Sequence, residues 1–341
     1  MMTQKHFHTI IIGAGPGGLS CATHLAKEGK DVLILERNKT IGPKICAGGV
    51  TWSGLARHLP EELIERQFER QHIHSSWQKI VIKAPEPIIS TVNRETVGRW
   101  MAQNAINSGA MLYTDQSVVK ITENKVHTKS SCYTYDFLVG ADGSNSMVRR
   151  FLNVPTDLIG VGIHYHIQGH FPKMVWDLEP DLFKSGYAWI FPHKNRASVG
   201  AYANRNDLSP KKLRENLHQW MKKHDIDYKG LKAEAGTINF DYRGWRFCNT
   251  FLVGDAAGLA SGLTGEGIYP AVLSGETVAE AILDPAYNCK KLDTLIKKQQ
   301  RHTKMLKLLG SRTIVAKAVL EILVIALKLK ILSFKSLEMG D

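Results

Sequence analysis

The sequence of 341 residues predicts an α/β protein with additional α+β elements, in which a parallel βαβ unit precedes an antiparallel sheet and a set of C-terminal helices. Three observations predict this order. A β-branched run at residues 7–12 leads into a glycine-rich turn, alternating glycine- and aromatic-rich segments fill about 160–240, and residues 291–336 have helical spacing almost throughout. The length is close to the limit of one hydrophobic core, so we expect two intimately joined domains.

Composition and charge narrow the class of protein. Hydrophobic residues make up 43% and charged residues 22%, which excludes a disordered tail, a collagen-like fibre and a polytopic membrane protein. The formal net charge is +12, and the last 52 residues alone carry +8. There the basic residues alternate with Leu, Ile and Val, which argues against nucleic acid as a partner and favours an anionic lipid surface or a solvated helical face.

The five cysteines are odd in number, scattered and free of CxxC pairs, and no signal peptide precedes them. We therefore expect no disulfide framework and a location in the reducing cytoplasm.

The first strand–helix–strand unit is predicted by a change in the spacing of apolar residues from a strand pattern to a helical one. The strand at 7–12 is followed by helical spacing that stops at Gly29, and a second apolar run occupies 32–35. These lengths match two buried parallel strands with their crossover helix. The remaining predicted elements are a helix at about 94–108, short strands at 111–113, 117–121, 125–127 and 135–139, a helix at about 209–224, a strand at 250–253 and a helix at about 267–283.

The turn between the first strand and helix has the spacing Gly13-x-Gly15-x-x-Gly18, and Glu36 ends the second strand. Gly13 would make the tight turn, Gly15 would let the backbone approach a pyrophosphate, and Gly18 would let the helix pack on the strand. The free amides of the helix N-terminus favour a phosphate. Glu36 would accept hydrogen bonds from ribose hydroxyls. The unit is therefore Rossmann-like and predicts a dinucleotide site.

Two further segments carry a family resemblance. Residues 139–150 read VGADGSNSMVRR, and residues 251–268 read FLVGDAAGLASGLTGEGI. Together with the glycine turn, in this order, they resemble the FAD-dependent oxidoreductases of the p-hydroxybenzoate hydroxylase fold, and within that fold the geranylgeranyl reductase family with its bacterial FixC-type members. The resemblance implies a Rossmann-like FAD-binding domain, an antiparallel-sheet substrate domain and C-terminal helices. The expected ranges are 1–75, 92–157 and 245–285 for the first, 76–91 and 158–244 for the second, and 286–341 for the third.

The resemblance also implies a set of FAD-binding residues. They are Gly13, Ala14, Gly15, Gly18, Glu36, Arg37, Cys46, Ala47, Gly49, Arg94, Val118, Asp142, Asp255, Gly265, Gly267 and Ile268. Asp255 would hold the ribityl hydroxyls, and the amides after Gly265 would face the N1–C2=O edge of the flavin. Each acidic or basic candidate has an alternative role: Asp142 as a turn carboxylate, Asp255 as a helix N-cap, and Arg94 as a solvated helix-start residue.

Two segments favour a reductase over a hydroxylase. Residues 41–50, IGPKICAGGV, resemble the family's loop with the motif K-x-C-G-G-G, which places Cys46 beside the isoalloxazine ring. Cys46 would tune the flavin or relay a proton there, and its alternative is a buried apolar thiol. Tyr187, Trp189 and Phe191 match the family's YxWxFP pattern and share one strand face, which suits an isoprenoid chain or a plain aromatic core.

The last predicted helix, from about 313 to 335, is nearly all Leu, Ile, Val and Ala. Lys317, Glu321, Lys328 and Lys335 form one stripe of it, so it is a poor transmembrane span. Two alternatives remain open: an interfacial helix at a membrane surface, and a helix packed over the substrate tunnel.

The expected function is FAD-dependent reduction of C=C bonds in an isoprenoid or prenyl lipid, with NADPH or a ferredoxin-like protein as electron donor. The alternatives are an FAD- and NADPH-dependent aromatic or quinone-precursor monooxygenase, and a flavin-carrying, membrane-associated regulatory or stress protein. We expect no metal ligands, because the pairs His6/His8 and His72/His74 lack companions. The expected partners are a prenyl lipid and an anionic membrane surface, with the protein cytoplasmic or peripheral at the inner face of the membrane.

Overall fold

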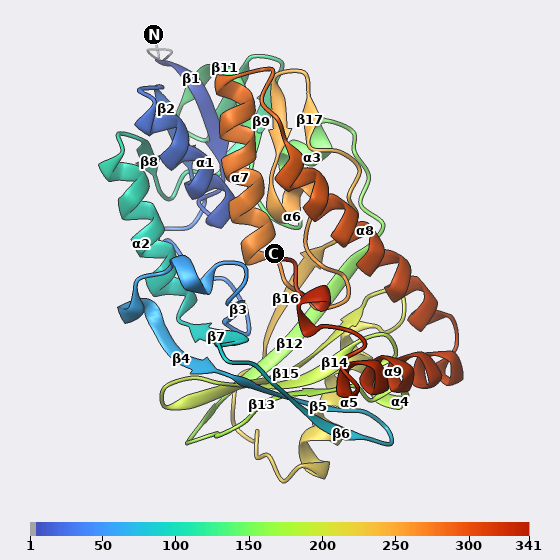
Figure 1. Cartoon of the computed structure of the whole chain (residues 1–341). Helices are drawn as coiled ribbons and strands as arrows, with labels where there is room; N and C mark the ends of the chain where they lie inside the picture. Colours follow the sequence, from blue (N-terminus) through green and yellow to red (C-terminus); the bar gives the residue numbers. More distant parts are fainter. Residues whose placement is uncertain (1–4, 341) are drawn as a thin grey trace.

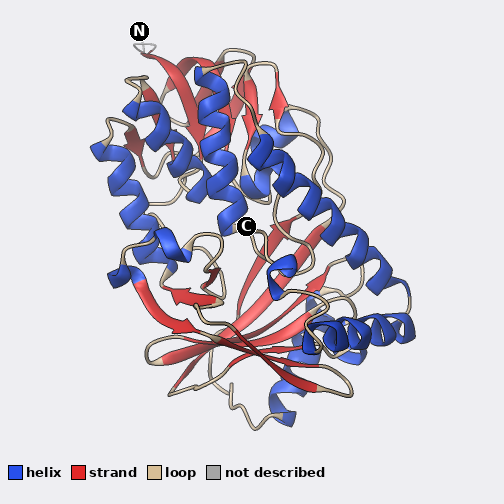
Figure 2. Cartoon of the chain, viewed as in Figure 1, coloured by secondary structure: helices blue, strands red, loops and turns tan. Residues whose placement is uncertain are grey.

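The computed structural model describes residues 5–340, arranged as two stacked regions (Figure 1). The upper region contains a largely parallel sheet with helices packed against it, and the lower region contains a strongly twisted antiparallel sheet (Figure 2). A small third sheet lies between them at one side of the molecule. The α/β fold class predicted from the sequence is confirmed.

The upper sheet has the strand order β17-β18-β11-β1-β2-β8, and β9 and β10 extend β11 as an antiparallel flap. β18, β11, β1, β2 and β8 run parallel to one another. Their bounds are β1 Lys5–Ile12, β2 Val32–Leu35, β8 Met111–Tyr113, β9 Val118–Thr122, β10 Lys125–Thr128, β11 Cys132–Gly140, β17 Arg246–Phe247 and β18 Thr250–Leu252. Ile12 pairs with both Leu35 and Gly140, so the carboxyl ends of these strands meet at one edge of the sheet.

Three long helices cover one side of this sheet: α1 (Pro16–Lys27), α2 (Arg94–Asn107) and α7 (Ile268–Leu283). α1 and α7 approach so closely that a Cβ on Gly275 would lie 2.2 Å from the carbonyl oxygen of Gly17. Two glycines therefore set the distance between these helices. α2 begins at the N-cap Asn93, whose side chain accepts hydrogen bonds from the amides of Glu95 and Thr96. Short helices α3 (Met147–Phe151) and α6 (Gly254–Ala257) follow β11 and β18.

The lower sheet has seven strands in the order β16-β12-β15-β14-β13-β5-β6, antiparallel except for the pair β13–β5. Their bounds are β5 Arg70–His74, β6 Lys79–Lys83, β12 Ile159–Gln168, β13 Met174–Asp177, β14 Tyr187–Pro192, β15 Arg196–Asn204 and β16 Glu234–Asn239. The helices α4 (Pro180–Phe183) and α5 (Pro210–Lys223) cover one face, where the α5 residue Trp220 packs with Ile163 and Val199. The other face points toward the parallel sheet.

The small sheet consists of β3 (Gly49–Thr51), β7 (Ile89–Val92) and β4 (Ile64–Phe68), with the short helices η1 (Ala56–His58) and η2 (Glu61–Leu63) beside it. No element was predicted between residues 41 and 91. The sequences of β4 (IERQF) and β7 (ISTV) place two or three polar residues between apolar ones, so they lack the alternation of a half-buried strand, and their pairing supplies the order.

The C-terminal residues form α8 (Lys290–Ser311), α9 (Thr313–Lys328) and the short helix η3 (Phe334–Leu337). The prediction of helix over most of 291–336 is confirmed, with breaks at Arg312 and after Lys328. The predicted last helix ends at Lys328 instead of about 335, so Lys335 lies in η3 and not on the charged stripe of α9. α8 runs along the side of both regions, and α9 lies against the lower sheet (Figure 1). None of the helices within the described part of the chain is long and apolar enough to cross a membrane.

Candidate cofactor and substrate site

A cavity of about 800 Å³ lies between the carboxyl edge of the parallel sheet and the inner face of the seven-stranded sheet. This volume is typical of a site for a large cofactor or ligand. All but one of the predicted site residues line it, and the exception is Gly18. The residues in its wall are Gly13, Ala14, Gly15, Glu36, Arg37, Cys46, Ala47, Gly49, Arg94, Val118, Asp142, Tyr187, Trp189, Phe191, Asp255, Gly265, Gly267 and Ile268.

The glycine turn after β1 has three different steric situations. Gly13 has φ +103°, and a Cβ there would lie 2.4 Å from the carbonyl oxygen of Ala141. Gly18 is closed by packing, because its Cβ would lie 2.2 Å from the carbonyl oxygen of Gly13. Gly15 is different: the nearest atom to its Cβ would be 3.9 Å away, and it lines the cavity. Gly13 and Gly18 therefore shape the turn, and Gly15 leaves space in front of α1.

Glu36, at the end of β2, holds this turn in place. One carboxylate oxygen accepts a hydrogen bond from the amide of Ala14 at 2.8 Å, and the other accepts two from Asn38. A carboxylate oxygen has two lone pairs, so acceptor capacity remains for hydroxyl groups of a ligand. The side chain is buried in the cavity wall.

Arg94 and Asp142, two polar residues in the wall, each carry buried side-chain atoms that have no hydrogen-bond partner among residues 5–340. Arg94 is the first residue of α2 and is 9% exposed, and its Nε and Nη1 atoms have no hydrogen-bond acceptor. This burial excludes the solvated alternative for Arg94. Asp142 accepts from the amide of Met147 through Oδ2, which is turn chemistry, while its Oδ1 is unpartnered. Burial raises the pKa of Asp142. Buried atoms of this kind cost free energy unless a ligand satisfies them.

Asp255 lies inside the short helix α6, whose N-cap is Val253, so the N-cap alternative for Asp255 is wrong. Its Oδ2 atom lies 3.0 Å from Lys44 Nζ and 3.0 Å from Ser144 Oγ. The carboxylate thus joins three segments that are far apart in sequence. Lys44 and Ser144 were not singled out from the sequence, although both lie within the quoted motifs and could have been.

The turn before α7 carries the carboxyl group of Glu266, which was also not singled out from the sequence. Glu266 accepts hydrogen bonds from Thr51 Oγ1 at 2.8 Å and from the backbone amide of Met339 at 2.9 Å. Burial raises the pKa of Glu266 to about 7. It therefore ties the turn Gly265–Gly267 both to the small sheet and to the last residues of the described chain.

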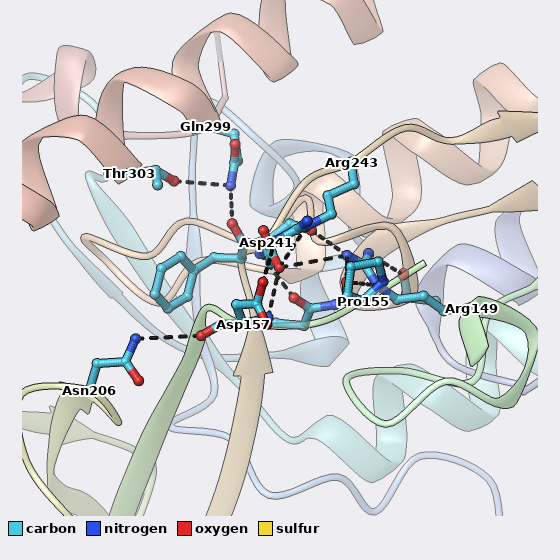
Figure 3. Close-up of polar contacts among 11 residues, drawn as sticks. Arg149, Pro155, Asp157, Asn206, Asp241, Arg243, Gln299 and Thr303 are labelled. Atoms are coloured by element: carbon cyan, nitrogen blue, oxygen red, sulfur yellow. Dashed lines mark hydrogen bonds and ion pairs between the residues drawn. The ribbon is translucent and has the colours of Figure 1, made fainter. Parts of the chain in front are cut away.

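Behind the cavity, Arg149 of the VGADGSNSMVRR segment holds the two regions together (Figure 3). Its guanidinium donates to the carbonyl oxygens of Pro155, Ala256 and Asp241, and its side chain is 1% exposed. Arg243 adds ion pairs with Asp241 and Asp157. This network positions α6, and with it Asp255, relative to the seven-stranded sheet.

The loop that carries Cys46 leads directly into β3 of the small sheet. Cys46 is half-buried in the cavity wall, and its Sγ accepts a hydrogen bond from the amide of Gly48 at 3.4 Å. The thiol therefore faces the cavity and is not an inert core atom. His193 supports the loop through the carbonyl oxygen of Ala47, and Glu65 supports His193.

Tyr187, Trp189 and Phe191 lie on one face of β14, as predicted, and successive ring centroids are 6.1 Å apart. All three are buried and line the cavity, so the core and cavity-wall alternatives both describe them. Tyr187 Oη donates to the carbonyl oxygen of Thr264, which joins this wall to the turn before α7. Trp176 and Phe334 continue the aromatic surface.

α9 packs on the outside of this wall. Val324 and Leu327 belong to the same apolar cluster as Tyr187, Trp189 and Phe334. The charged stripe faces the protein at its start: Glu321 is buried and accepts hydrogen bonds from Ser75, Trp77 and Gln78, and Lys317 pairs with Asp181. Packing over the substrate side is thus the alternative that the contacts support for one face of this helix.

Comparison with known proteins identifies the family to which this chain belongs. A family model described as an FAD binding domain matches residues 6–282, so the chain belongs to this family of FAD-binding proteins. It is an FAD-dependent oxidoreductase. The chain is 28% identical to the geranylgeranyl diphosphate reductase of Rhodobacter capsulatus, over 81% of this chain and 75% of that protein. It is 27% identical to digeranylgeranylglycerophospholipid reductase 2 of Methanopyrus kandleri, over 81% of this chain and 78% of that protein.

Among solved structures, the fold matches a geranylgeranyl bacteriochlorophyll reductase-like protein from Thermoplasma acidophilum with a TM-score of 0.78. The identity is 21%, and the match covers 91% of this chain and 89% of that one. The fold also matches the flavin-dependent brominase Bmp2 with a TM-score of 0.69. The identity is 17%, and the match covers 93% of this chain and 90% of that one. Both matches establish the same fold.

The residues of the cavity fit FAD. The first turn of α1 presents free amides beside an open Gly15, which suits a pyrophosphate. The unpartnered Arg94 guanidinium supplies cationic donors, and Asp255 and Glu36 supply acceptors for hydroxyl groups. The donors and acceptors of an FAD molecule thus have counterparts on several elements of this wall.

Proposed function

We propose that this protein reduces C=C bonds of an isoprenoid or prenyl lipid. The observation that carries the proposal is the continuity of one cavity, which runs from the Gly13–Gly15 turn to the aromatic wall of Tyr187, Trp189 and Phe191. The names of the relatives from Rhodobacter capsulatus and Methanopyrus kandleri support a prenyl substrate. An apolar chain lying against three aromatic rings would stay out of water and in a fixed orientation.

Bound FAD supplies the hydride in such reductions. The chain's own residues supply the rest. We propose that Gly15 and the α1 amides bind the pyrophosphate, that Asp255 binds ribityl hydroxyls, and that Arg94 compensates phosphate charge. The aromatic wall excludes water from the apolar chain. The Cys46 thiol, which faces the cavity, holds the proton that completes the addition at Sγ.

The test is an anaerobic one. The flavin of the purified protein is reduced, geranylgeranyl diphosphate or a prenyl lipid is added, and flavin reoxidation is followed together with the mass of the extracted lipid. We expect reoxidation coupled to a gain of two hydrogens per bond reduced. NADPH and reduced ferredoxin are compared as donors. Oxygen-dependent consumption of NADPH with a hydroxylated product would contradict the proposal and favour a monooxygenase.

Cys46→Ser and Cys46→Ala separate the role of the thiol from that of the cavity. If Cys46 holds the proton, both variants keep their flavin and their lipid binding but form saturated product at least about tenfold more slowly. Unchanged turnover in Cys46→Ala would remove Cys46 from the mechanism and leave the reductase proposal intact.

We also propose that α9 places the protein on an anionic membrane surface. The face of α9 opposite its packed side is apolar and exposed: Ile322 is 66% exposed, and Ile331, just beyond the helix, is 77% exposed. Lys328 and Lys330 are exposed beside them. Trp77, whose amide binds Glu321 of α9, adds an exposed aromatic ring. Isoleucines that enter the acyl boundary and lysines that meet anionic headgroups are the pattern of an interfacial helix.

Co-sedimentation with vesicles tests this surface. We expect binding to vesicles that contain phosphatidylglycerol, weaker binding to pure phosphatidylcholine, and a decrease with salt. The double variant Ile322→Asp/Ile331→Asp is expected to lower partitioning at least about tenfold, since each buried isoleucine contributes about 1.5–3 kcal/mol. Val119→Asp, on the distant strand β9, is the matched control. Equal partitioning of both variants would contradict the proposal.

A further inference from the structure

Strand pairing brings two histidines and a glutamate together on the inner face of the seven-stranded sheet. His164 and His166 are two residues apart on β12, so their side chains share one face. β16 pairs antiparallel with β12 in a register that sets Glu234 opposite His164. The next pair on the same face is Gly162 with Gly236, and both glycines line the cavity, as His164 does.

The three side chains converge within bonding reach of a single ion. His164 Nε2 lies 3.3 Å and His166 Nε2 lies 3.8 Å from Oε2 of Glu234. One ligand atom from each residue falls within 4.8 Å of the others. Ligands about 2 Å from a tetrahedral ion are spaced at about 3.3 Å, so small rotations would bring all three to that distance.

The hydrogen bonds around His164 leave one nitrogen without a partner. Nδ1 lies 2.7 Å from Ser198 Oγ, which also accepts a hydrogen bond from Trp189 Nε1 at 3.1 Å. A hydroxyl oxygen has two lone pairs, so it can accept from both Trp189 and His164. In the tautomer with its proton on Nδ1, His164 presents the Nε2 lone pair toward the Glu234 carboxylate, and this nitrogen is buried with no hydrogen-bond partner among residues 5–340. Two lone pairs that face each other require a proton or a cation between them.

His164 is 2% exposed, so its ring is held away from bulk water. A neutral imidazole is the ligand form of histidine. The charges facing the cluster from neighbouring elements are mixed: Glu65 and Glu234 favour a cation, whereas Arg196 and His193 oppose it. His166 and Glu234 are partly exposed, which leaves a path for an ion to enter.

We propose that His164, His166 and Glu234 form a binding site for one Zn²⁺ ion at the edge of the cavity. Two imidazoles and one carboxylate are a ligand set that Zn²⁺ adopts with a fourth position left to water or substrate. Ser198 supports the site from behind, because a hydrogen bond to the second ring nitrogen orients a metal-binding histidine. An ion here would hold His164 in the Nδ1–H form and, through Ser198, would fix the indole of Trp189 in the cavity wall.

The test is calorimetric titration of Zn²⁺ into the flavin-loaded protein after treatment with a chelator. We expect about one ion per chain. His166→Ala and Glu234→Gln are expected to weaken binding at least about 100-fold, and Ser198→Ala about tenfold. His170→Ala, an exposed histidine just beyond the same strand, is the matched control and keeps full affinity. Far-ultraviolet circular dichroism and flavin content are measured for every variant.

Absence of saturable Zn²⁺ binding, or binding that survives in both His166→Ala and Glu234→Gln, would overturn the proposal. In that case the residues form a Glu234–His164–Ser198 hydrogen-bond chain without an ion. Should a variant lose its fold, zinc K-edge X-ray absorption of the wild-type complex decides. Two imidazole nitrogens and a carboxylate oxygen in the coordination shell support the site, and a shell without imidazole excludes it.

Discussion

His193 Nε2 lies 3.0 Å from the carbonyl oxygen of Ala47, which ties the loop that carries Cys46 to the end of β14. The other ring nitrogen, Nδ1, faces the Glu65 carboxylate. A carbonyl oxygen is an acceptor only, so Nε2 is the donor to Ala47. A Cβ on Gly48 would lie 2.6 Å from His193 Cε1, which shows how closely the loop packs on this ring. The position of Cys46 in the cavity thus depends on a histidine about 150 residues later in the chain.

Replacing this histidine should loosen the loop. His193→Ala leaves the Ala47 carbonyl and the Glu65 carboxylate without their donor, which is expected to lower the free energy of unfolding by about 1–3 kcal/mol. Urea denaturation at pH 7 measures the loss. His170→Ala, at an exposed site, is expected to change the free energy by less than about 0.5 kcal/mol. Equal effects of the two variants would contradict the role assigned to His193.

The contact between His193 and Glu65 also predicts how the free energy of unfolding depends on pH. The hydrogen bond from His193 lowers the pKa of Glu65 below its ordinary value. A carboxyl group with a lowered pKa in the folded state contributes stability above its unfolded pKa of about 4.3, and this contribution is lost as the pH falls through the folded pKa. Wild-type protein should therefore lose more stability between pH 6 and pH 3 than Glu65→Gln does. Parallel stability–pH curves over that range would disprove the assignment.

The glycine turn allows folding to be separated from cofactor binding. Gly15→Ala adds a methyl group in open space at an ordinary φ, so the fold should keep its melting temperature, but the methyl group would occupy the place expected for the pyrophosphate. Gly18→Ala places a methyl group 2.2 Å from Gly13 O and should cost about 1–3 kcal/mol. The measurements are flavin content from absorbance and thermal unfolding. A stable Gly15→Ala protein with full flavin would disprove the binding role of this turn.

Glu266 predicts a pH dependence of stability opposite in sign to that of Glu65. Its pKa is raised to about 7 by burial, so the folded state binds more protons than the unfolded state between about pH 4.5 and pH 7. Stability contributed by this group is present in full below its unfolded pKa and declines as the pH rises to about 7, by on the order of 3 kcal/mol. Glu266→Gln should remove most of the decline. The free energy of unfolding at pH 5 and pH 8 measures it, and an unchanged difference between these values in the variant would refute the prediction.

Arg149 predicts the largest loss of stability. Arg149→Met leaves the carbonyl oxygens of Pro155, Ala256 and Asp241 unpaired and Asp241 without a buried cation, at a cost of about 3–5 kcal/mol. Arg149→Lys should recover only part of it, because an ammonium group cannot reproduce the planar fork of donors. Arg150→Ala, on the exposed neighbour, serves as the control for denaturation. A loss below 1 kcal/mol in Arg149→Met would contradict the bridging role in Figure 3.

Much of the fold was predictable because its signals are local. The βαβ unit, the helices α2, α5 and α7, and the strands around residues 111–140 follow from short-range periodicity and turn chemistry. The small sheet between residues 49 and 92 was not predicted, because β4 and β7 do not alternate apolar with polar residues. Arg94 was assigned from the sequence only as a candidate. Its burial depends on the packing of α2 against the loop at Gly42, where a Cβ on Gly98 would lie 2.5 Å from Gly42 Cα.

The sequence by itself determined the glycine turn, the dinucleotide site at that turn and the single aromatic face of β14, because each depends on the spacing of residues that are neighbours in the chain. The tertiary structure decided which charges face inward. Glu321 and Lys317 of α9 turn toward Ser75 and Asp181, because a buried charge costs free energy unless a partner satisfies it. The apolar residues of α9 divide between the packed side, with Val324 and Leu327, and the exposed side, with Ile322. The tertiary structure also set Glu234 beside His164 and His193 beside Ala47. Sheet register and loop packing create these pairs, and neither leaves a mark in the local pattern of residues.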